Sequence, residues 1–263
     1  MADALRASNL PAYGYFRDTA PNLTALGRHA TVFRNHLANY PGTPVSVSQI
    51  LTGRLMSPLL LHADLAVVPV KAIPRDLAVL PRVLREAGYR TGIVTGHPFL
   101  GQARLTQEFE GRFLVGPRGR APYASLRDMM GPIQAFLGQA SSDPRPFFLY
   151  VHPMDTHGPL QPHRRFARFR GQPAPPHYDE YDENILFTDH WVGRILAEIE
   201  DLGLADRTVF VFTSDHGEEF NEAGPGYWNA AHGYTLRRAQ LHVPLIIRVP
   251  DDPRPGREYA SLT

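Results

Sequence analysis

The sequence predicts an α/β fold in which a mainly parallel sheet is sandwiched by helices. Three segments with helical spacing of apolar residues are each followed by an apolar run of strand length. The runs at residues 147–151 and 209–212 are continuously apolar rather than alternating, which is typical of parallel strands covered on both faces. Strands that alternate with helices along a chain pair in parallel, because each helix carries the chain back across the sheet.

Two helices are expected before the first of these units. The first begins near Asp18, where cap-type residues and a proline precede apolar residues at helical spacing, and it runs to about Leu37. The second is short: Thr43 is expected as its N-cap, Pro44 as its first helical residue, and Gly53 as its end.

The three helix–strand units follow in order. Their expected helices cover residues 81–88, 123–137 with a kink at 131–132, and 185–202, and the paired strands cover residues 89–95, 147–151 and 208–212. One more strand is expected at residues 244–249, and no internal repeat is visible. We expect residues 1–263 to form a single α/β domain.

Composition excludes several classes of function. The 263 residues carry a net formal charge of +1, which gives no bulk attraction to nucleic acid, and there is no cysteine to form disulfides or thiolate ligands. No apolar run approaches the length of a membrane span, and the amino terminus lacks a signal-peptide pattern. We therefore expect a soluble chain; its compartment and oligomeric state stay open.

The most informative polar residues are Asp215 and His216, which follow the apolar run at residues 209–212 after Thr213 and Ser214. Open α/β sheets bind ligands at the carboxyl ends of their strands. A carboxylate beside an imidazole suits zinc or manganese, and Gly217 allows a tight turn around an ion. The alternative is a turn in which the Asp215 side chain is satisfied by the backbone.

A second polar loop follows the strand predicted at residues 147–151. His157 is placed to donate a hydrogen bond to an anion or to lie in a surface turn, whereas His152 is expected to be a buried, hydrogen-bonded structural residue. His232 lies in a Gly- and Asn-rich loop that can fold back over the same site.

Thr43 is the candidate nucleophile. A hydroxyl at a helix N-terminus gains from the helix dipole and from free amide groups that bind ester oxygens. The alternative is a simple helix cap, with Ser46 and Ser48 as fallback nucleophiles inside the helix. A bound divalent cation favours the nucleophilic function, because it promotes the alkoxide.

Several motifs in order resemble the sulfatase-like branch of the alkaline phosphatase superfamily, nearly end to end. They are Thr213-Ser-Asp-His-Gly-Glu218, His232-Gly-Tyr-Thr-Leu236, Leu241-His-Val-Pro-Leu-Ile-Ile247, the segment 147–157, Leu51-Thr-Gly-Arg54 and the opening residues 3–23. The resemblance implies a single divalent metal, zinc or manganese rather than calcium, held by Asp3, Thr43, Asp215 and His216. It also implies that Thr43 is the nucleophile and that His157 and His232 bind the oxygens of a small anionic ester.

The chain departs from that family at three places. Its sequence at residues 43–47 lacks the Cys or Ser motif that is oxidised to formylglycine, so no formylglycine is expected and phosphorus esters become at least as plausible as sulfate esters. The first strand is expected to be missing before Asp3, which would leave Asp3 on a flexible terminus. The C-terminal subdomain is expected to be missing after Thr263.

Three functions follow from these observations. The leading one is metal-dependent hydrolysis of sulfate or phosphate esters through a covalent Thr43 intermediate. The second is transfer of a phosphoethanolamine- or phosphoglycerol-type group to an acceptor alcohol. The third is a noncatalytic remnant of the fold without a working metal centre.

Overall fold

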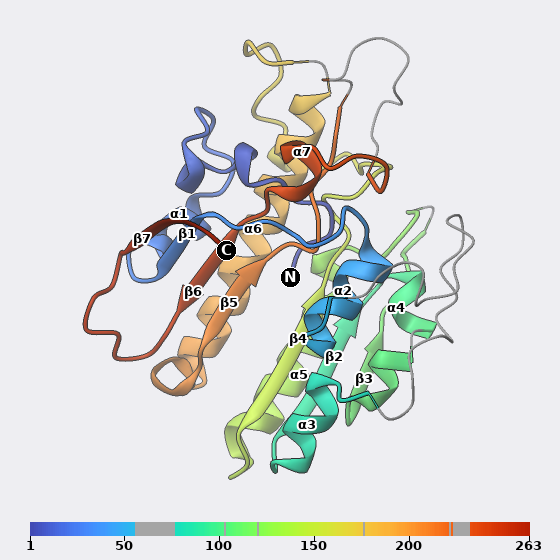
Figure 1. Cartoon of the computed structure of the whole chain (residues 1–263), viewed down its shortest axis with the longest axis vertical. Coiled ribbons are helices and arrows are strands. Elements are labelled where there is room, and N and C mark those ends of the chain that lie inside the picture. Colours follow the sequence, from blue (N-terminus) through green and yellow to red (C-terminus); the bar gives the residue numbers. More distant parts are fainter. Residues whose placement is uncertain (56–76, 103, 120, 176, 221, 223–231) are drawn as a thin grey trace.

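The computed structural model describes residues 1–55, 77–102, 104–119, 121–175, 177–220, 222 and 232–263 (Figure 1). The α-helices within these ranges are α1 (Pro21–Gly27), α2 (Thr43–Thr52), α3 (Leu80–Glu86), α4 (Pro98–Gln102), α5 (Leu126–Ser142), α6 (Tyr178–Asp201) and α7 (Arg238–Leu241). The strands are β1 (Thr31–Asn35), β2 (Arg90–Thr95), β3 (Gly111–Leu114), β4 (Phe147–His152), β5 (Phe210–Thr213), β6 (Leu245–Arg248) and β7 (Glu258–Leu262).

The strands form two sheets that lie side by side in Figure 1. In the three-stranded sheet, ordered β3-β2-β4, the central strand β2 is parallel to both neighbours. In the four-stranded sheet, ordered β5-β6-β1-β7, strand β6 is antiparallel to β5 and β1, while β7 is parallel to β1. Most pairings between the described strands are therefore parallel, which confirms the predicted α/β class.

The first residues of the chain connect the two sheets. The amino group of Met1 donates to the carbonyl oxygen of Val151 at the end of β4 (2.8 Å), and the amide of Ala2 donates to that of Thr213 at the end of β5 (2.8 Å). Ala2 also forms a parallel bridge with Ser214. Asp3 consequently lies where the carboxyl ends of β4 and β5 meet, which is the edge at which open α/β sheets bind ligands.

Helices cover both faces of β2. Successive side chains of a strand point to opposite faces, so the neighbours Ile93 and Val94 enter different apolar clusters. Val94 shares a cluster with Met129 and Ile133 of α5, and Ile93 shares one with residues of α2 such as Val45. The predicted sandwich of helices around the sheet is confirmed at this strand.

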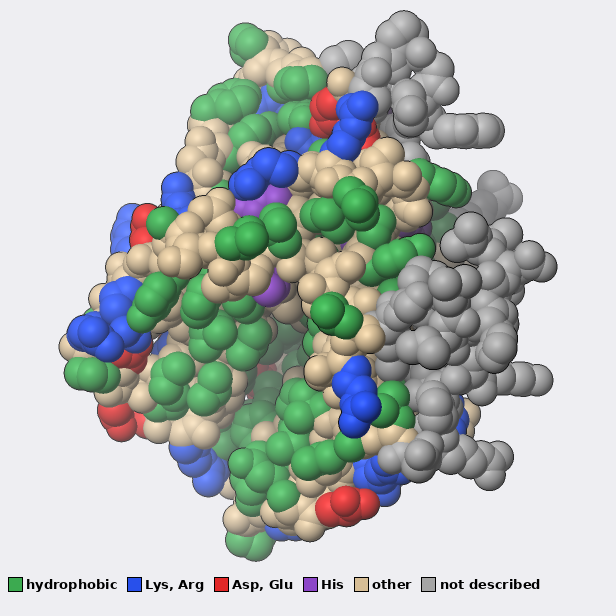
Figure 2. All heavy atoms as spheres, viewed as in Figure 1, with side chains coloured by type: hydrophobic (Ala, Val, Ile, Leu, Met, Phe, Trp, Pro, Cys, Tyr) green, Lys and Arg blue, Asp and Glu red, His purple; other side chains and the backbone are tan. Residues whose placement is uncertain are grey.

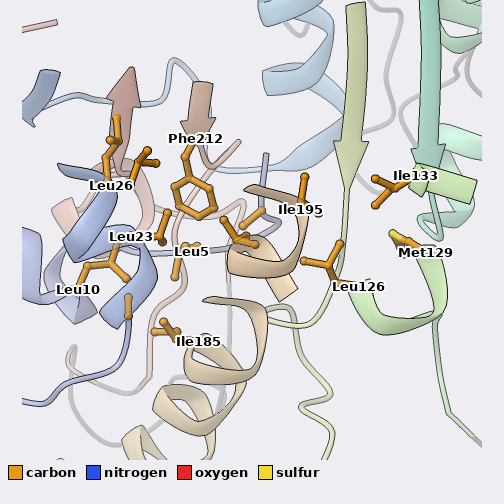
Figure 3. Close-up of a cluster of buried hydrophobic side chains, with 14 of the residues drawn as sticks. Leu5, Leu10, Leu23, Leu26, Leu126, Met129, Ile133, Ile185, Ile195 and Phe212 are labelled. Carbon is orange, nitrogen blue, oxygen red and sulfur yellow. The ribbon is translucent and has the colours of Figure 1, made fainter. Parts of the chain in front are cut away.

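The larger cluster also joins α1 and α6 to the four-stranded sheet. Figure 3 shows Leu23 and Leu26 of α1 close to Phe212 of β5, with Ile195 of α6 beside them. The same cluster includes Leu5, which follows the connection between the two sheets (Figure 3). The segment that carries Asp3 is thus anchored by buried apolar side chains.

Some predicted elements have different boundaries. The helix expected to reach Leu37 ends at Gly27, and residues 31–35 form β1, because the β-branched pair Thr31-Val32 aligns with β6. The N-cap of α2 is Gly42 rather than Thr43. Helix α5 begins after a capping box at Ser125 and includes Pro132 without ending there. Strands β3 and β7 were not predicted.

None of the described helices combines the length and the apolar content that crossing a bilayer needs.

Candidate active site

Two buried aspartates form the centre of the site. Asp3 and Asp215 are both 0% exposed, and each uses one carboxylate oxygen for hydrogen bonds within the protein. Oδ1 of Asp215 accepts from the amides of His216 (2.9 Å) and Ala4 (3.3 Å), while Oδ2 of Asp3 lies 3.0 Å from Nε2 of His152. The other two oxygens, Asp3 Oδ1 and Asp215 Oδ2, have no hydrogen-bond partner among the described residues.

His216 lies beside both unpartnered oxygens. Its Nδ1 is 2.8 Å from the carbonyl oxygen of Gly217, and since a carbonyl can only accept, Nδ1 carries the proton of the neutral ring. Nε2 therefore presents a lone pair, 3.5 Å from Oδ1 of Asp3 and 3.6 Å from Oδ2 of Asp215. This is the tautomer that a histidine needs to bind a metal ion through Nε2.

The Thr43 hydroxyl completes this cluster. Its Oγ1 lies 3.1 Å from Nε2 of His216 and 3.5 Å from Oδ2 of Asp3. Thr43 is the buried first residue of α2, and the N-cap position is held by Gly42 instead. The interpretation of Thr43 as a simple cap is therefore wrong. The fallback hydroxyls are already engaged, because Ser46 donates to the carbonyl of Asp215 (2.6 Å) and Ser48 to that of Pro44 (2.6 Å).

The geometry fits a divalent cation. Two buried carboxylate oxygens without donors are costly unless a positive charge lies between them. The distances from Nε2 of His216 to its three neighbours span 3.1 to 3.6 Å, and a tetrahedral ion with bonds of ~2.1 Å separates its ligands by roughly 3.4 Å. Asp3, His152 and Asp215 also form a group whose ligand atoms all lie within 4.8 Å of one another.

The expectation that Asp3 lies on a flexible terminus is wrong. Its amide donates to the carbonyl of Pro153 (3.1 Å), and its own carbonyl accepts from the Thr156 hydroxyl. Ala4 then adopts a left-handed backbone with φ of 57°, which few non-glycine residues do. That turn aims the Ala4 amide at Asp215 and so ties the two carboxylates together.

Position 217 requires a glycine because there is no room for a Cβ, not because the backbone adopts a left-handed conformation. A Cβ at this position would lie 2.1 Å from the carbonyl oxygen of Ala239, while the Gly217 amide donates to Gln240 (2.7 Å). Gly217 is not among the described glycines with positive φ. The predicted tight turn is therefore a close approach of α7 to the loop that carries His216.

His157 and His232 lie next to this cluster. Their ring centroids are 4.9 Å apart, and the ring of His232 lies 4.3 Å from that of His216. Nδ1 of His232 is 3.0 Å from Oε1 of Glu218, and although burial lowers the pKa of His232, this carboxylate raises it overall. His157 donates from Nδ1 to the carbonyl of Gly158. The structure thus brings together all six residues predicted for the site.

The electrostatic balance keeps Asp3 ionised. Burial by itself would raise the pKa of Asp3, but the hydrogen bond from His152 and the electrostatic influence of His157, His152 and His216 hold that pKa well below its usual range. His152 itself is 0% exposed and hydrogen-bonded, which confirms the predicted structural environment of this side chain.

Two residues of the site were not predicted. His97 follows β2, and its Nε2 lies 3.5 Å from Oδ2 of Asp3. Glu218 is buried beside His232. A signal existed for both: His97 follows the carboxyl end of a predicted strand, and Glu218 is two residues past the Asp-His pair.

His97 presents a ring N–H toward Asp3, with its Nε2 3.5 Å from Oδ2. Its Nδ1 accepts from the amides of Phe99 (3.1 Å) and Leu100 (3.4 Å), so the proton of the neutral ring is on Nε2. Burial lowers the pKa of His97 to about 4, which keeps the ring neutral at physiological pH. A protonated Nε2 has no lone pair for a metal ion.

Little of this centre reaches the surface. Asp3, His152, Asp215 and His216 are each 0% exposed, while His97 and His232 are partly exposed. On the face drawn in Figure 2, histidine side chains show only at a few separate points. A small molecule entering from solvent would therefore meet the partly exposed histidines before the buried candidate metal ligands.

The Sulfatase family model matches residues 1–262. One curated relative, N-acetylgalactosamine-6-sulfatase of Canis lupus familiaris, is 29% identical over 262 residues, which cover 82% of this chain and 49% of the relative. The chain spans about half or less of the length of the curated relatives it matches.

Solved structures share the fold. The C-terminal periplasmic domain of EcEptC from Escherichia coli, in complex with Zn, has a TM-score of 0.73 at 22% identity and covers 95% of this chain and 71% of its own. A protein in the alkaline phosphatase superfamily from Vibrio parahaemolyticus has a TM-score of 0.73 at 17% identity, covering 99% and 60%. Phosphonate monoester hydrolase of Agrobacterium radiobacter reaches 0.75 at 19% identity, covering 100% and 69%.

The family model matches nearly the whole chain, and one of the structures that share its fold is a protein in the alkaline phosphatase superfamily, which the sequence motifs resemble. The chain belongs to the sulfatase family.

Proposed function

We propose that this chain hydrolyses sulfate or phosphate esters through a covalent intermediate on Thr43. One observation carries the proposal: the two buried carboxylate oxygens without partners, Asp3 Oδ1 and Asp215 Oδ2, lie beside Nε2 of His216, which is 3.1 Å from the Thr43 hydroxyl. A cation site next to a hydroxyl at a helix N-terminus is an arrangement suited to nucleophilic attack on an anionic ester.

Asp3, Thr43, Asp215 and His216 would hold one divalent ion, with zinc or manganese preferred by the mixed oxygen and nitrogen donors. When bound, the ion lowers the pKa of the Thr43 hydroxyl and offsets negative charge on the ester. The zinc complex of the structurally similar EcEptC domain supports this choice of metal.

The proposed reaction has two displacements. The Thr43 oxygen forms a bond to sulfur or phosphorus as its hydroxyl gives up a proton, the bond to the leaving alcohol oxygen breaks, and that oxygen takes up a proton. Water then attacks the sulfur or phosphorus, the bond to the Thr43 oxygen breaks, one proton of the water passes to that oxygen, and the inorganic or monoester product leaves. His232, whose pKa the Glu218 carboxylate raises in spite of burial, and His157 would bind the nonbridging oxygens, on which negative charge grows during transfer.

The nucleophile also bears on the substrate class. Thr43 carries a secondary hydroxyl where the formylglycine-dependent members of the family carry a Cys or Ser precursor, so the proposal requires no formylglycine. The similar fold of a phosphonate monoester hydrolase agrees with phosphorus esters as substrates. A second candidate, transfer of the group from Thr43 to an acceptor alcohol, is favoured by the same threonine and differs only in what replaces water.

The test is a substrate panel with metal content measured in the same samples. The panel contains a phosphomonoester, a phosphodiester, a phosphonate monoester and a sulfate monoester, each assayed with zinc and with manganese. Thr43→Ala should lower turnover of the best substrate at least ~10³-fold, and Thr43→Ser should retain part of it. Ser48→Ala, in the same helix, is the matched control and should leave turnover unchanged.

The outcomes separate the candidates. A Thr43→Ala variant as active as the parent refutes the nucleophile, and an acceptor alcohol that captures the group in place of water favours transfer. A protein that binds no zinc or manganese after reconstitution favours the noncatalytic remnant. Mass spectrometry of the peptide around Thr43, after rapid acid quench, should detect the covalent intermediate in the parent.

A further inference from the structure

The loop after β4 holds Asp3 at three points. Pro153 accepts the Asp3 amide through its carbonyl, Thr156 donates its hydroxyl to the Asp3 carbonyl, and His152 contacts the carboxylate at 3.0 Å. Backbone and side chain of Asp3 are therefore both fixed by a segment that is adjacent in space and distant in sequence.

The hydrogen bonds of His152 have only one consistent direction. Oδ2 of an ionised Asp3 can only accept, so Nε2 of His152 must donate to it. The neutral ring then has a lone pair on Nδ1, which lies 3.0 Å from the hydroxyl of Tyr150. Tyr150 must therefore donate to His152, and all three groups are buried.

Tyr150 is suited to that role because it stays protonated. Burial and the nearby carboxylates raise the pKa of its hydroxyl well above the ordinary value. The phenol thus fixes the tautomer of the imidazole. Metal-bound histidines are held in the same way by hydrogen bonds to their second ring nitrogen, but here the histidine orients a carboxylate instead of binding the ion.

This chain of donors assigns different functions to the two oxygens of Asp3. Oδ2 accepts from His152 and lies 3.5 Å from the protonated Nε2 of His97, whereas Oδ1 has no partner and points toward His216. A carboxylate that rotated about its Cβ–Cγ bond would lose the hydrogen bond from His152. The cation would therefore meet one oxygen in one fixed direction.

We propose that His152 is a positioning residue for the metal ligand Asp3, oriented in turn by the Tyr150 hydroxyl, and that it is not itself a metal ligand. This inference rests on the proposed function, because it requires that Asp3 bind a cation. It assigns His152 to the metal site through a hydrogen bond, although the ring lies close enough to both carboxylates to be mistaken for a ligand, 4.0 Å from Oδ2 of Asp215.

The first test measures zinc affinity by competition with a chelator. His152→Ala should weaken zinc binding about 10- to 100-fold, the usual cost of losing an outer partner. His152→Gln, which keeps an N–H donor near the position of Nε2, should recover much of that loss. Tyr150→Phe should weaken binding less than His152→Ala does.

Two matched controls separate positioning from general damage. Tyr13→Phe removes another partly buried phenol hydroxyl, one that contacts the backbone of Leu245, and His242→Gln removes a histidine that contacts the carbonyl of Arg34. Both should leave zinc affinity unchanged. Near-ultraviolet circular dichroism of the ion-free proteins verifies that each variant is folded.

The second test counts imidazole ligands by X-ray absorption of the zinc-loaded protein. We expect one imidazole in the parent and one in His152→Ala. A count that falls by one in His152→Ala shows that His152 is a ligand and overturns the inference, as do His152 variants with unchanged zinc affinity. A parent that binds no zinc overturns the proposed function together with this inference, whereas the other failures leave the proposed function standing.

Discussion

Nε2 of His216 lies 3.5 Å from Oδ1 of Asp3, although the two residues are far apart in the sequence. The approach depends on Ala2, which bridges to Ser214, and on the backbone bond between Asp3 and Pro153. The backbone contacts of residues 1–3 therefore determine whether the candidate metal ligands come together.

Asp215→Asn should stabilise the ion-free protein and abolish its response to zinc. The Asn oxygen can keep the bonds from His216 and Ala4, while its amide replaces Oδ2 and can donate toward Asp3. We expect the melting temperature without metal to rise by ~2–5 °C, because one of two apposed buried charges is removed.

The zinc response is measured in the same melting experiment. Zinc at 100 times its dissociation constant stabilises a binding protein by ~2.7 kcal/mol, and this increase should disappear in Asp215→Asn. Asp206→Asn, on an exposed residue, is the control. An Asp215→Asn protein that is less stable without metal than the parent would contradict the expectation.

Asp155 should make stability depend on pH. Burial raises the pKa of this carboxyl to about 7, and its Oδ2 accepts from the Leu126 amide at the start of α5. Because the folded pKa is above the unfolded one, the folded state binds more protons between pH ~4 and ~7, so its stability falls as the pH rises through that window.

Asp155→Asn should remove this pH dependence. Urea unfolding at pH 5, 6, 7 and 8 measures the free energy of unfolding of both proteins. The value for the variant should rise relative to that of the parent as the pH rises, by a total on the order of a few kcal/mol. The Asn oxygen can still accept from Leu126. A difference between variant and parent that is constant across these pH values would show that Asp155 titrates normally.

Gly217→Ala should damage the metal site more than the fold. The added Cβ would meet the Ala239 carbonyl at 2.1 Å, which forces the backbone of the His216 loop away from α7. We expect a loss of ~1–3 kcal/mol in stability and a weaker zinc affinity, both measured against Gly116→Ala, whose Cβ would meet nothing within 4 Å. Parent-like zinc affinity in Gly217→Ala would mean that the loop tolerates the shift.

Arg17→Met should be strongly destabilising. The Arg17 guanidinium lies 2.8 Å from the Asp182 carboxylate, and both side chains are fully buried. Removing the cation leaves a buried carboxylate uncompensated, at a cost of ~3–5 kcal/mol. Urea unfolding measures the loss, and Asp182→Asn in the Arg17→Met background should recover part of it. A loss below 1 kcal/mol would mean that water or Asn9 and Tyr15 compensate the charge.

The sequence was sufficient for the elements with strong local signals. The sequence predicts buried runs such as residues 147–152 and long amphipathic segments such as α6, because the apolar residues of each follow a single period. Strand β1 was missed because apolar residues at Leu23, Leu26 and Ala30 continue helical spacing into Phe33. Its strand conformation comes from pairing with β6 and β7, which no local pattern encodes.

The site was predicted unevenly for a related reason. Asp215 and His216 follow a strand and are visible from local sequence, whereas Asp3 was recognised only through family motifs, because its burial depends on contacts with residues 153 and 214. His97 was missed although it obeys the same strand-end rule. The donor chain from Tyr150 to Asp3 depends on ring orientation, which a sequence does not specify.

The insertion of Met1 and Ala2 between β4 and β5 has a mechanical consequence. The line along which the two sheets meet carries Asp3, Asp215 and His216. Thr43 reaches the same place from α2, a helix that packs on β2. An ion bound by these side chains would connect the two sheets. Hydrogen exchange at the Ala2 and Asp3 amides should therefore slow when zinc binds. The same ion would then both stabilise the contact between the two sheets and complete the catalytic site.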